Sequence, residues 1–158
     1  MTAIFAGTFD PFTVGHKDIV RRALGIFESV IIAVADETGK ATASLDARVR
    51  ISRLSVSDLK GVSVEPFSGL LSEYVKSKPN VVLVRGLRNA VDFDYERELC
   101  EVYRSLGVDN AVHIISAPEY SAVSSTTVRR LAALSADLSA FVDGVAQKEI
   151  ISQYGIKE

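Results

Sequence analysis

Three stretches of this chain concentrate residue types that bind anions in proteins. Thr13-Val14-Gly15-His16 joins a threonine suited to cap a helix to a glycine and one of only two histidines. Arg85-Gly86-Leu87-Arg88 offers two guanidinium groups, whose forked donors match phosphate. Ser124-Ser125-Thr126-Thr127 places four hydroxyl groups ahead of a helical pattern. Because free N–H groups at helix N-termini also attract anions, the three stretches indicate a phosphate-binding site.

Each stretch also has a purely structural interpretation. Thr13 and one of the hydroxylated residues at 124–127 are natural helix caps, and His16 would then be a surface residue. The two arginines have carboxylates downstream with which they could form ion pairs instead, namely Asp92, Asp94 and Glu96. A short motif alone does not decide between these interpretations, so the elements that position the residues matter.

Strand-like and helix-like patterns alternate along the chain. Nearly continuous apolar runs occupy residues 3–6, 30–35, 62–67, 81–84 and 111–116. Helical spacing of apolar residues marks stretches at 19–27, 49–59, 70–75 and 99–106, and again near 124–135 and 143–154. This alternation predicts an α/β fold, in which one Rossmann-like domain over 1–158 has a five-stranded parallel sheet with helices on both faces.

In such a sheet, ligands bind beyond the carboxyl ends of the strands. The residues after each apolar run are therefore the ones to inspect, and the polar, basic and glycine residues gather there. GTFDPFTVGH follows the first run, RGLRNAVDFDYE the fourth and APEYSAVSSTT the fifth. The sequence thus predicts one composite site built from several loops at a single edge of the sheet.

The composition excludes several classes of protein. The net charge of −2 over 158 residues gives no electrostatic case for a nucleic-acid binder. The single cysteine, Cys100, permits no disulfide within the chain and no cysteine cluster for a metal. There is no signal-peptide pattern and no apolar run long enough to span a bilayer, so we expect a cytoplasmic protein without membrane contacts.

Longer stretches around the candidate residues resemble a known enzyme family. The decapeptide GTFDPFTVGH at 7–16 is similar to the (H/T)-x-G-H signature of the nucleotidylyltransferase superfamily, with Thr13 at the variable first position. The stretches RGLR at 85–88, DFDYE at 92–96 and VSSTTVR at 123–129 resemble the phosphopantetheine adenylyltransferase family, in order and at the family's spacing. Together these matches are far more specific than any one of them.

The resemblance implies the transfer of an adenylyl group from ATP to 4′-phosphopantetheine, giving dephospho-coenzyme A and pyrophosphate. It places His16, Lys40 and Arg88 at catalytic positions. Positions that bind ATP in the family are matched by Thr8, Phe9, His16, Gly86, Leu87, Arg88, Glu96, Tyr120, Ser121, Ala122, Val123, Ser124, Ser125 and Thr126. Positions that bind phosphopantetheine are matched by Thr8, Lys40, Leu71 and Arg85.

The resemblance also implies a homohexamer and coenzyme A as a feedback ligand. We expect Mg²⁺ to arrive with ATP rather than in a protein site, because no carboxylate cluster stands out. Some residues keep a simpler interpretation: Leu71 fits the core as well as a substrate pocket, Cys100 reads as core and His113 as structural.

Three alternatives remain at this stage. The chain could be another small-molecule nucleotidylyltransferase, although those enzymes lack the series of stretches at 85–88, 92–96 and 123–129. It could be a nucleotide-binding module without turnover, but a pure binder has no need of His16, Lys40 and Arg88 together. A class I aminoacyl-tRNA synthetase shares the fold, but this chain has no room for an anticodon domain.

Overall fold

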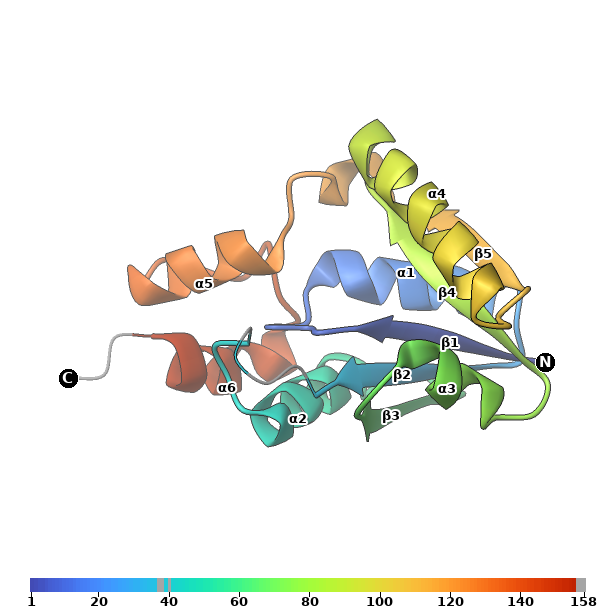
Figure 1. Cartoon of the computed structure of the whole chain (residues 1–158). Helices are drawn as coiled ribbons and strands as arrows, with labels where there is room; N and C mark the ends of the chain where they lie inside the picture. Colours follow the sequence, from blue (N-terminus) through green and yellow to red (C-terminus); the bar gives the residue numbers. More distant parts are fainter. Residues whose placement is uncertain (37–38, 40, 156–158) are drawn as a thin grey trace.

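Five parallel strands form one sheet in the order β3-β2-β1-β4-β5 in the computed structural model (Figure 1). The structure describes residues 1–36, 39 and 41–155. The strands are β1 (Thr2–Gly7), β2 (Ser29–Ala35), β3 (Val62–Phe67), β4 (Val81–Leu87) and β5 (Ala111–Ile115). With β1 in the middle and the chain moving outward on either side, this is the order of a doubly wound sheet. The predicted Rossmann-like fold class is confirmed.

Helices cover both faces of the sheet, as the near-continuous apolar strands require. On one face lie α1 (Val14–Leu24), α2 (Leu45–Ser55) and α6 (Gly144–Tyr154), and on the other α3 (Leu71–Lys76) and α4 (Ala90–Ser105). Successive residues of β1 alternate between the two cores, with Phe5 facing the first and Ile4 the second. Within the described part of the chain, no helix has the length and apolar character that a bilayer crossing needs.

The last two helices of the chain lie beyond the carboxyl ends of the strands. After β5 come a short 3₁₀ turn, η1 (Pro118–Tyr120), and then α5 (Ser125–Ala133). Figure 1 shows α5 and α6 lying past the arrowheads of the strands, opposite the N-terminus of the chain. The loop that follows β1 lies beside the start of α5, where Ser125 donates to the Pro11 carbonyl oxygen.

Two boundaries predicted from the sequence are wrong in the stretch 85–96. The sequence predicts that the fourth strand ends at residue 84, because polar residues follow it. In the structure β4 continues to Leu87, because residues 85–87 pair with residues 113–115 of β5. The stretch DFDYE reads as a loop but belongs to α4, because the Asn89 side chain caps that helix by accepting the Asp92 N–H at 2.9 Å.

A buried lysine joins α1 to the C-terminal part of the chain. Lys17 is 7% exposed at its side chain, and its Nζ lies 2.5 Å from Asp143 Oδ2 and 2.6 Å from Asp58 Oδ1. Asp143 is also the N-cap residue of α6. Two carboxylates offset the burial of one ammonium group, so α1 and α6 are held together at their first turns.

The packing of α1 against β4 depends on a glycine in the strand. A Cβ atom added to Gly86 would lie 2.9 Å from Cγ1 of Ile19, a distance that real Cβ contacts essentially never show. Ile19 is itself 3% exposed and packs in the first core, so a Cβ at position 86 would force its side chain or α1 to shift. Only glycine at position 86 allows α1 to approach the strand this closely.

We therefore expect Gly86→Ala to lower the free energy of unfolding by about 1–3 kcal/mol, the usual cost of overpacking a core. Urea denaturation of the two proteins would measure the difference. Gly144→Ala is the matched control, because no atom lies within 4 Å of a Cβ added there and the position begins a helix. Equal unfolding midpoints for Gly86→Ala and the unmodified chain would contradict the packing argument.

Candidate active site

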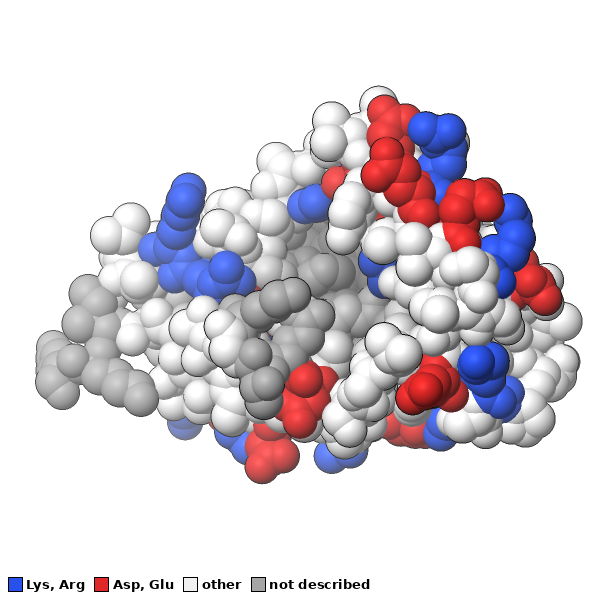
Figure 2. All heavy atoms as spheres, in the orientation of Figure 1, with Lys and Arg blue, Asp and Glu red and all other residues white. Residues whose placement is uncertain are grey.

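A cavity of about 520 Å³ opens at the carboxyl ends of β1 and β4. Figure 2 shows this face of the molecule hollowed between α4 and α5. Its walls come from the loop after β1, the first turn of α1, the end of β4, the start of α4 and the segment leading into α5. The polar and charged residues among them are Thr8, Asp10, Thr13, His16, Arg85, Arg88, Asp92, Tyr95, Glu96, Ser116, Ser124, Ser125, Thr126 and Arg129.

Most residues predicted for the site line this one cavity. Thr8, Phe9, His16, Arg85, Gly86, Leu87, Arg88, Glu96, Val123, Ser124, Ser125 and Thr126 all do so. Tyr120, Ser121 and Ala122 are not among its lining residues. Leu71 does not line it either and packs against the core beneath α3 and α4, which is the structural interpretation given to it above. Lys40 lies outside the described residues.

Phe9 contributes backbone rather than an exposed ring. Its side chain is 4% exposed and its ring centroid lies 5.3 Å from that of Phe5 and 5.2 Å from that of Phe12. Its φ of 47° is in the left-handed region, which is strained for a residue with a Cβ atom. A substrate in the cavity would therefore meet the backbone of the 8–10 turn, while the ring anchors that turn in the core.

His16 occupies the third position of α1 and forms a reciprocal cap with Thr13. The Thr13 backbone N–H donates to Nδ1 of His16 at 3.0 Å, and Thr13 Oγ1 lies 3.1 Å from the same nitrogen. In return, the His16 backbone N–H donates to Thr13 Oγ1 at 3.4 Å. This is a capping box with histidine in the place of the usual glutamate or glutamine.

The environment of the His16 ring disfavours positive charge. Burial, and after it the nearby guanidinium of Arg88, lower the pKa of His16 to about 4. The imidazole is therefore neutral at pH 7, while its residue borders the cavity. A neutral imidazole can donate one hydrogen bond to an anion without gaining charge.

The arginines at the end of β4 are held by carboxylates of α4. Arg85 makes a forked pair with Glu96, with Nε to Oε2 at 2.7 Å and Nη2 to Oε1 at 2.6 Å. Arg88 donates from Nε to Asp92 Oδ2 at 2.9 Å and from its backbone N–H to the same oxygen at 3.0 Å. The ion pairs that the sequence left as an alternative thus form in this structure, and they involve Asp92 and Glu96.

The ion pairs leave some N–H donors of these arginines available for a phosphate. Each guanidinium has five N–H donors. Arg85 uses one on each of the two Glu96 oxygens and one on the Ala6 carbonyl oxygen at 3.1 Å. Two of its donors remain outside these bonds, and both Arg85 and the half-exposed Arg88 line the cavity. Both side chains are therefore oriented in advance by α4, which is favourable for binding an anion.

The four hydroxylated residues before and in α5 divide between the fold and the cavity. Ser124 caps α5 by accepting the Thr127 N–H at 3.1 Å, and its hydroxyl lies 2.8 Å from that of Thr127. Ser125 donates to the Pro11 carbonyl oxygen at 2.7 Å, which joins α5 to the loop after β1. Part of this hydroxyl cluster is thus structural, while Ser124, Ser125 and Thr126 also line the cavity.

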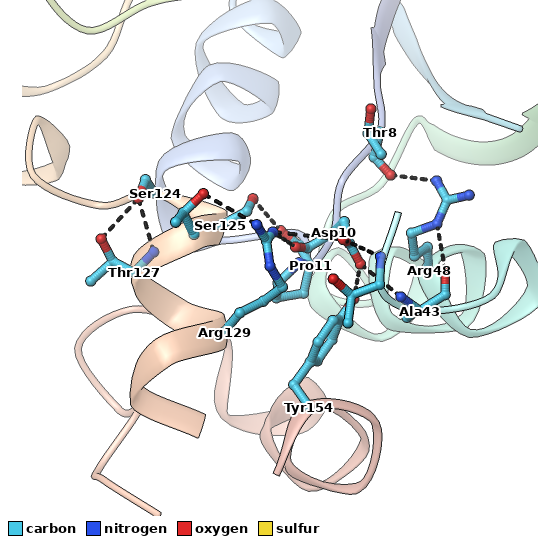
Figure 3. Close-up of polar contacts among 12 residues, drawn as sticks. Thr8, Asp10, Pro11, Ala43, Arg48, Ser124, Ser125, Thr127, Arg129 and Tyr154 are labelled. Atoms are coloured by element: carbon cyan, nitrogen blue, oxygen red, sulfur yellow. Dashed lines mark hydrogen bonds and ion pairs between the residues drawn. The ribbon is translucent and has the colours of Figure 1, made fainter. Parts of the chain in front are cut away.

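A buried carboxylate fixes the loop after β1 (Figure 3). Asp10, 5% exposed, accepts the backbone N–H groups of Thr42 at 2.7 Å and Ala43 at 3.1 Å and the hydroxyl of Tyr154 at 2.6 Å. Arg129 donates to its backbone carbonyl oxygen. Burial alone would raise the pKa of Asp10, but the hydrogen bonds from Thr42, Tyr154 and Ala43 outweigh it and lower the pKa.

Arg48 holds the same loop from the other side. It is 1% exposed, and its Nη1 donates to the carbonyl oxygens of Thr8 at 2.6 Å and Ala35 at 2.8 Å. Its Nε donates to the Ala43 carbonyl oxygen at 3.2 Å. One guanidinium therefore joins the loop after β1, the end of β2 and the residue before the N-cap of α2, and Figure 3 shows its bonds to Thr8 and Ala43.

Sequence reasoning missed several residues of the cavity and its support. Asp92, Tyr95, Ser116 and Arg129 line it, and Arg48 supports the loop after β1. Arg129 had a signal, because it ends the stretch VSSTTVR and lies one turn after the capping serine. The buried Oγ of Ser116 has no hydrogen-bond partner among the described residues. No pattern in the sequence predicts such a hydroxyl group.

A smaller cavity of about 310 Å³ lies between α4 and β5, away from this site. Cys100 Sγ and His113 Nε2 lie 3.6 Å apart in its wall. Cys100 is half-buried and belongs to neither of the two hydrophobic cores, so the prediction that it is a core residue is wrong. The reason is that this part of α4 packs on β5, which is an edge strand. Burial raises the pKa of the Cys100 thiol, so the thiol is protonated at neutral pH.

Comparison with known proteins finds a matching family model and relatives that cover nearly the whole chain. Residues 4–131 match the family model described as cytidylyltransferase-like. A phosphopantetheine adenylyltransferase of Acidovorax sp. (strain JS42) is 40% identical over 156 residues, covering 97% of this chain and 94% of that protein. The phosphopantetheine adenylyltransferases of Moorella thermoacetica and Hahella chejuensis are 39% and 38% identical, covering 97% and 99% of both partners.

The Asp10 network makes a prediction about stability. Asp10→Asn removes an acceptor from a cluster of buried donors, so we expect the free energy of unfolding to fall by about 2 kcal/mol or more at pH 7. Chemical denaturation would measure it, with the exposed Asp109→Asn as the control.

The same variant tests the pH dependence. The pKa of Asp10 is lowered in the folded chain, so its contribution is present above the ordinary value of 3.8 and is lost as the pH falls through the folded value. The difference in stability between the unmodified chain and Asp10→Asn should therefore shrink below pH 3.8. A difference that stays constant on acidification would show that the carboxylate charge contributes nothing.

Proposed function

The chain belongs to the phosphopantetheine adenylyltransferase family, and we propose that it transfers the adenylyl group of ATP to 4′-phosphopantetheine. The products are dephospho-coenzyme A and pyrophosphate, and the reaction is a step of coenzyme A synthesis. The observation that carries the proposal is identity of about 40% with such enzymes over nearly the whole length of this chain. The cavity that joins His16, Arg85 and Arg88 at the end of the sheet supports it.

The chemistry asks for alignment and charge neutralisation rather than for a nucleophilic side chain. A phosphate oxygen of phosphopantetheine attacks the α-phosphorus of ATP in line, forming one P–O bond, and the bond to the β-phosphate bridging oxygen breaks. The attacking oxygen is already anionic and the leaving pyrophosphate takes the electron pair, so no strong base is required. Catalysis then rests on positioning two polyanions and stabilising charge at the phosphorus.

The residues of the cavity fit these demands. We propose that His16 donates a hydrogen bond to the α-phosphate, and that Arg88 and the first turn of α5 bind the β- and γ-phosphates. Arg85, with Glu96 beside it, would bind the phosphate of phosphopantetheine, and Thr8 would lie between the two substrates. Lys40 completes this assignment by its match to the family.

We propose that Mg²⁺ reaches the site bound to the phosphates of ATP. Within 1–36, 39 and 41–155, no three His, Cys, Asp or Glu side chains are grouped so as to hold a metal ion. The carboxylates that line the cavity already have partners: Asp92 and Glu96 pair with arginines, and Asp10 accepts from Thr42, Ala43 and Tyr154. When bound with ATP, Mg²⁺ would offset the negative charge of the polyphosphate.

We also propose a cytoplasmic homohexamer that coenzyme A inhibits in the same cleft, as the family resemblance implies. Exposed apolar side chains on α4 and β5 support an oligomer, among them Val91, Phe93, Val102 and Ile115. Surfaces of this kind are common where subunits meet. Sedimentation of the full chain would measure the oligomeric state.

The assay that tests the function is pyrophosphate release from ATP. We expect release with 4′-phosphopantetheine as the acceptor and none with nicotinamide mononucleotide, which other nucleotidylyltransferases use. Turnover with nicotinamide mononucleotide alone would establish the alternative enzyme. Binding of ATP without turnover of either acceptor would establish a binding module.

His16→Ala tests the main catalytic assignment. We expect kcat to fall by about a hundredfold or more, the usual loss when a transition-state hydrogen-bond donor is removed. The KM for ATP should change less, because the arginines remain. Asp109→Asn, away from the site, serves as the control, and an unchanged kcat in His16→Ala would remove His16 from the catalytic group.

A further inference from the structure

The hydrogen bonds around His16 determine which of its ring nitrogens carries the proton. The Thr13 backbone N–H points at Nδ1 from 3.0 Å. A backbone N–H can only donate, so Nδ1 supplies its lone pair to it and carries no proton. Thr13 Oγ1 lies 3.1 Å from the same nitrogen, but a hydroxyl can take either role and does not require a proton there. On a neutral imidazole the single proton is then on Nε2.

The surroundings of the ring do not favour a second proton. Three phenylalanine rings lie around it, with centroids at 5.1 Å for Phe9, 5.2 Å for Phe12 and 6.2 Å for Phe5. His16 also lies in the first turn of α1, at the positive end of the helix dipole. Apolar walls and a positive dipole both make imidazolium less stable than imidazole.

The charged groups that share the cavity with His16 do not reverse this. They are Asp10, Arg85, Arg88, Asp92, Glu96 and Arg129. The three carboxylates are each engaged elsewhere, Asp10 by Thr42, Ala43 and Tyr154, Asp92 by Arg88 and Glu96 by Arg85. The cation that acts on His16 is Arg88, which opposes a second positive charge.

We propose that Thr13 is a positioning residue of this site, whose backbone N–H fixes His16 as an uncharged imidazole that donates from Nε2 to the reacting phosphate. The identity of that phosphate rests on the proposed function, whereas the tautomer rests on the geometry alone. Bound phosphates would attract a proton to the ring, but a proton on Nδ1 would face the Thr13 N–H directly. The cap therefore keeps the ring neutral even when two polyanions are present.

This assignment changes what His16 contributes. An uncharged donor gives a directed hydrogen bond and takes no part in general acid–base catalysis. That suits a reaction whose nucleophile is already an anion and whose leaving group needs no proton. Positive charge in the site would instead come from the arginines.

Nuclear magnetic resonance of the unliganded protein tests the tautomer directly. The chain has two histidines, so a ¹⁵N-histidine-labelled sample with His113→Gln leaves His16 as the single observed ring. We expect a protonated Nε2, an unprotonated Nδ1 and no titration between pH 8 and about 5.5, because the pKa of His16 is lowered to about 4. A proton on Nδ1, or titration near 6.5, would overturn the proposal. The measurement needs no substrate, so its outcome is independent of the proposed function.

A pair of variants tests the same assignment by activity. Glutamine can place an amide N–H near the position of Nε2, and asparagine near that of Nδ1. We expect His16→Gln to keep a kcat about tenfold or more above that of His16→Asn, since one transition-state donor is typically worth that factor or more. Both variants are uncharged, so charge does not separate them. Equal or reversed rates in folded variants would overturn the Nε2 assignment, and if either fails to fold, the resonance measurement on intact His16 decides.

Discussion

The candidate site depends on one buried carboxylate, that of Asp10. The loop after β1 has left the sheet, so its backbone groups lack ladder partners, and its Phe9 adopts a left-handed conformation. Asp10 binds this loop to residues 42 and 43 and to Tyr154, while Arg129 binds its backbone. A charged group so enclosed is stable only when its acceptor sites are filled. The helices α5 and α6 are thereby tied to the loop that forms the floor of the cavity.

Charge balance is the second constraint on the site. The chain has a net charge of −2 and no general basic surface, yet its cavity holds several arginines. The carboxylates of α4 resolve this conflict, because Asp92 and Glu96 are four residues apart and so lie on one face of the helix toward Arg88 and Arg85. The cations are kept in place and partly neutralised without ligand, and they retain donors for phosphate.

Local patterns in the sequence predicted the fold, but distant contacts could not be predicted. The five apolar runs became the five strands, since burial on both faces of a parallel sheet leaves a continuous apolar signature. The end of β4 was misjudged because pairing with β5, not composition, extends it through 85–87. Asp10 and Tyr154 are 144 residues apart, and Arg48 looks like any helical surface arginine, so no spacing rule links them to the site. The cavity residues with a local signature, such as His16 and Ser124, were found.

The spacing of Thr13 and His16 connects the fold to the chemistry. A capping box requires the N-cap residue and the third helical residue, because only that spacing lets each bond the backbone N–H of the other. Glutamate would satisfy the cap equally well but would bring a negative charge to a phosphate site. Histidine satisfies the cap with Nδ1 and, in the tautomer that we propose, keeps a donor on Nε2. The bond that starts α1 would then also orient the group that we propose to bind the α-phosphate. Moving His16 by one residue would lose the cap and the orientation together, which is a physical reason for the fixed spacing of the motif.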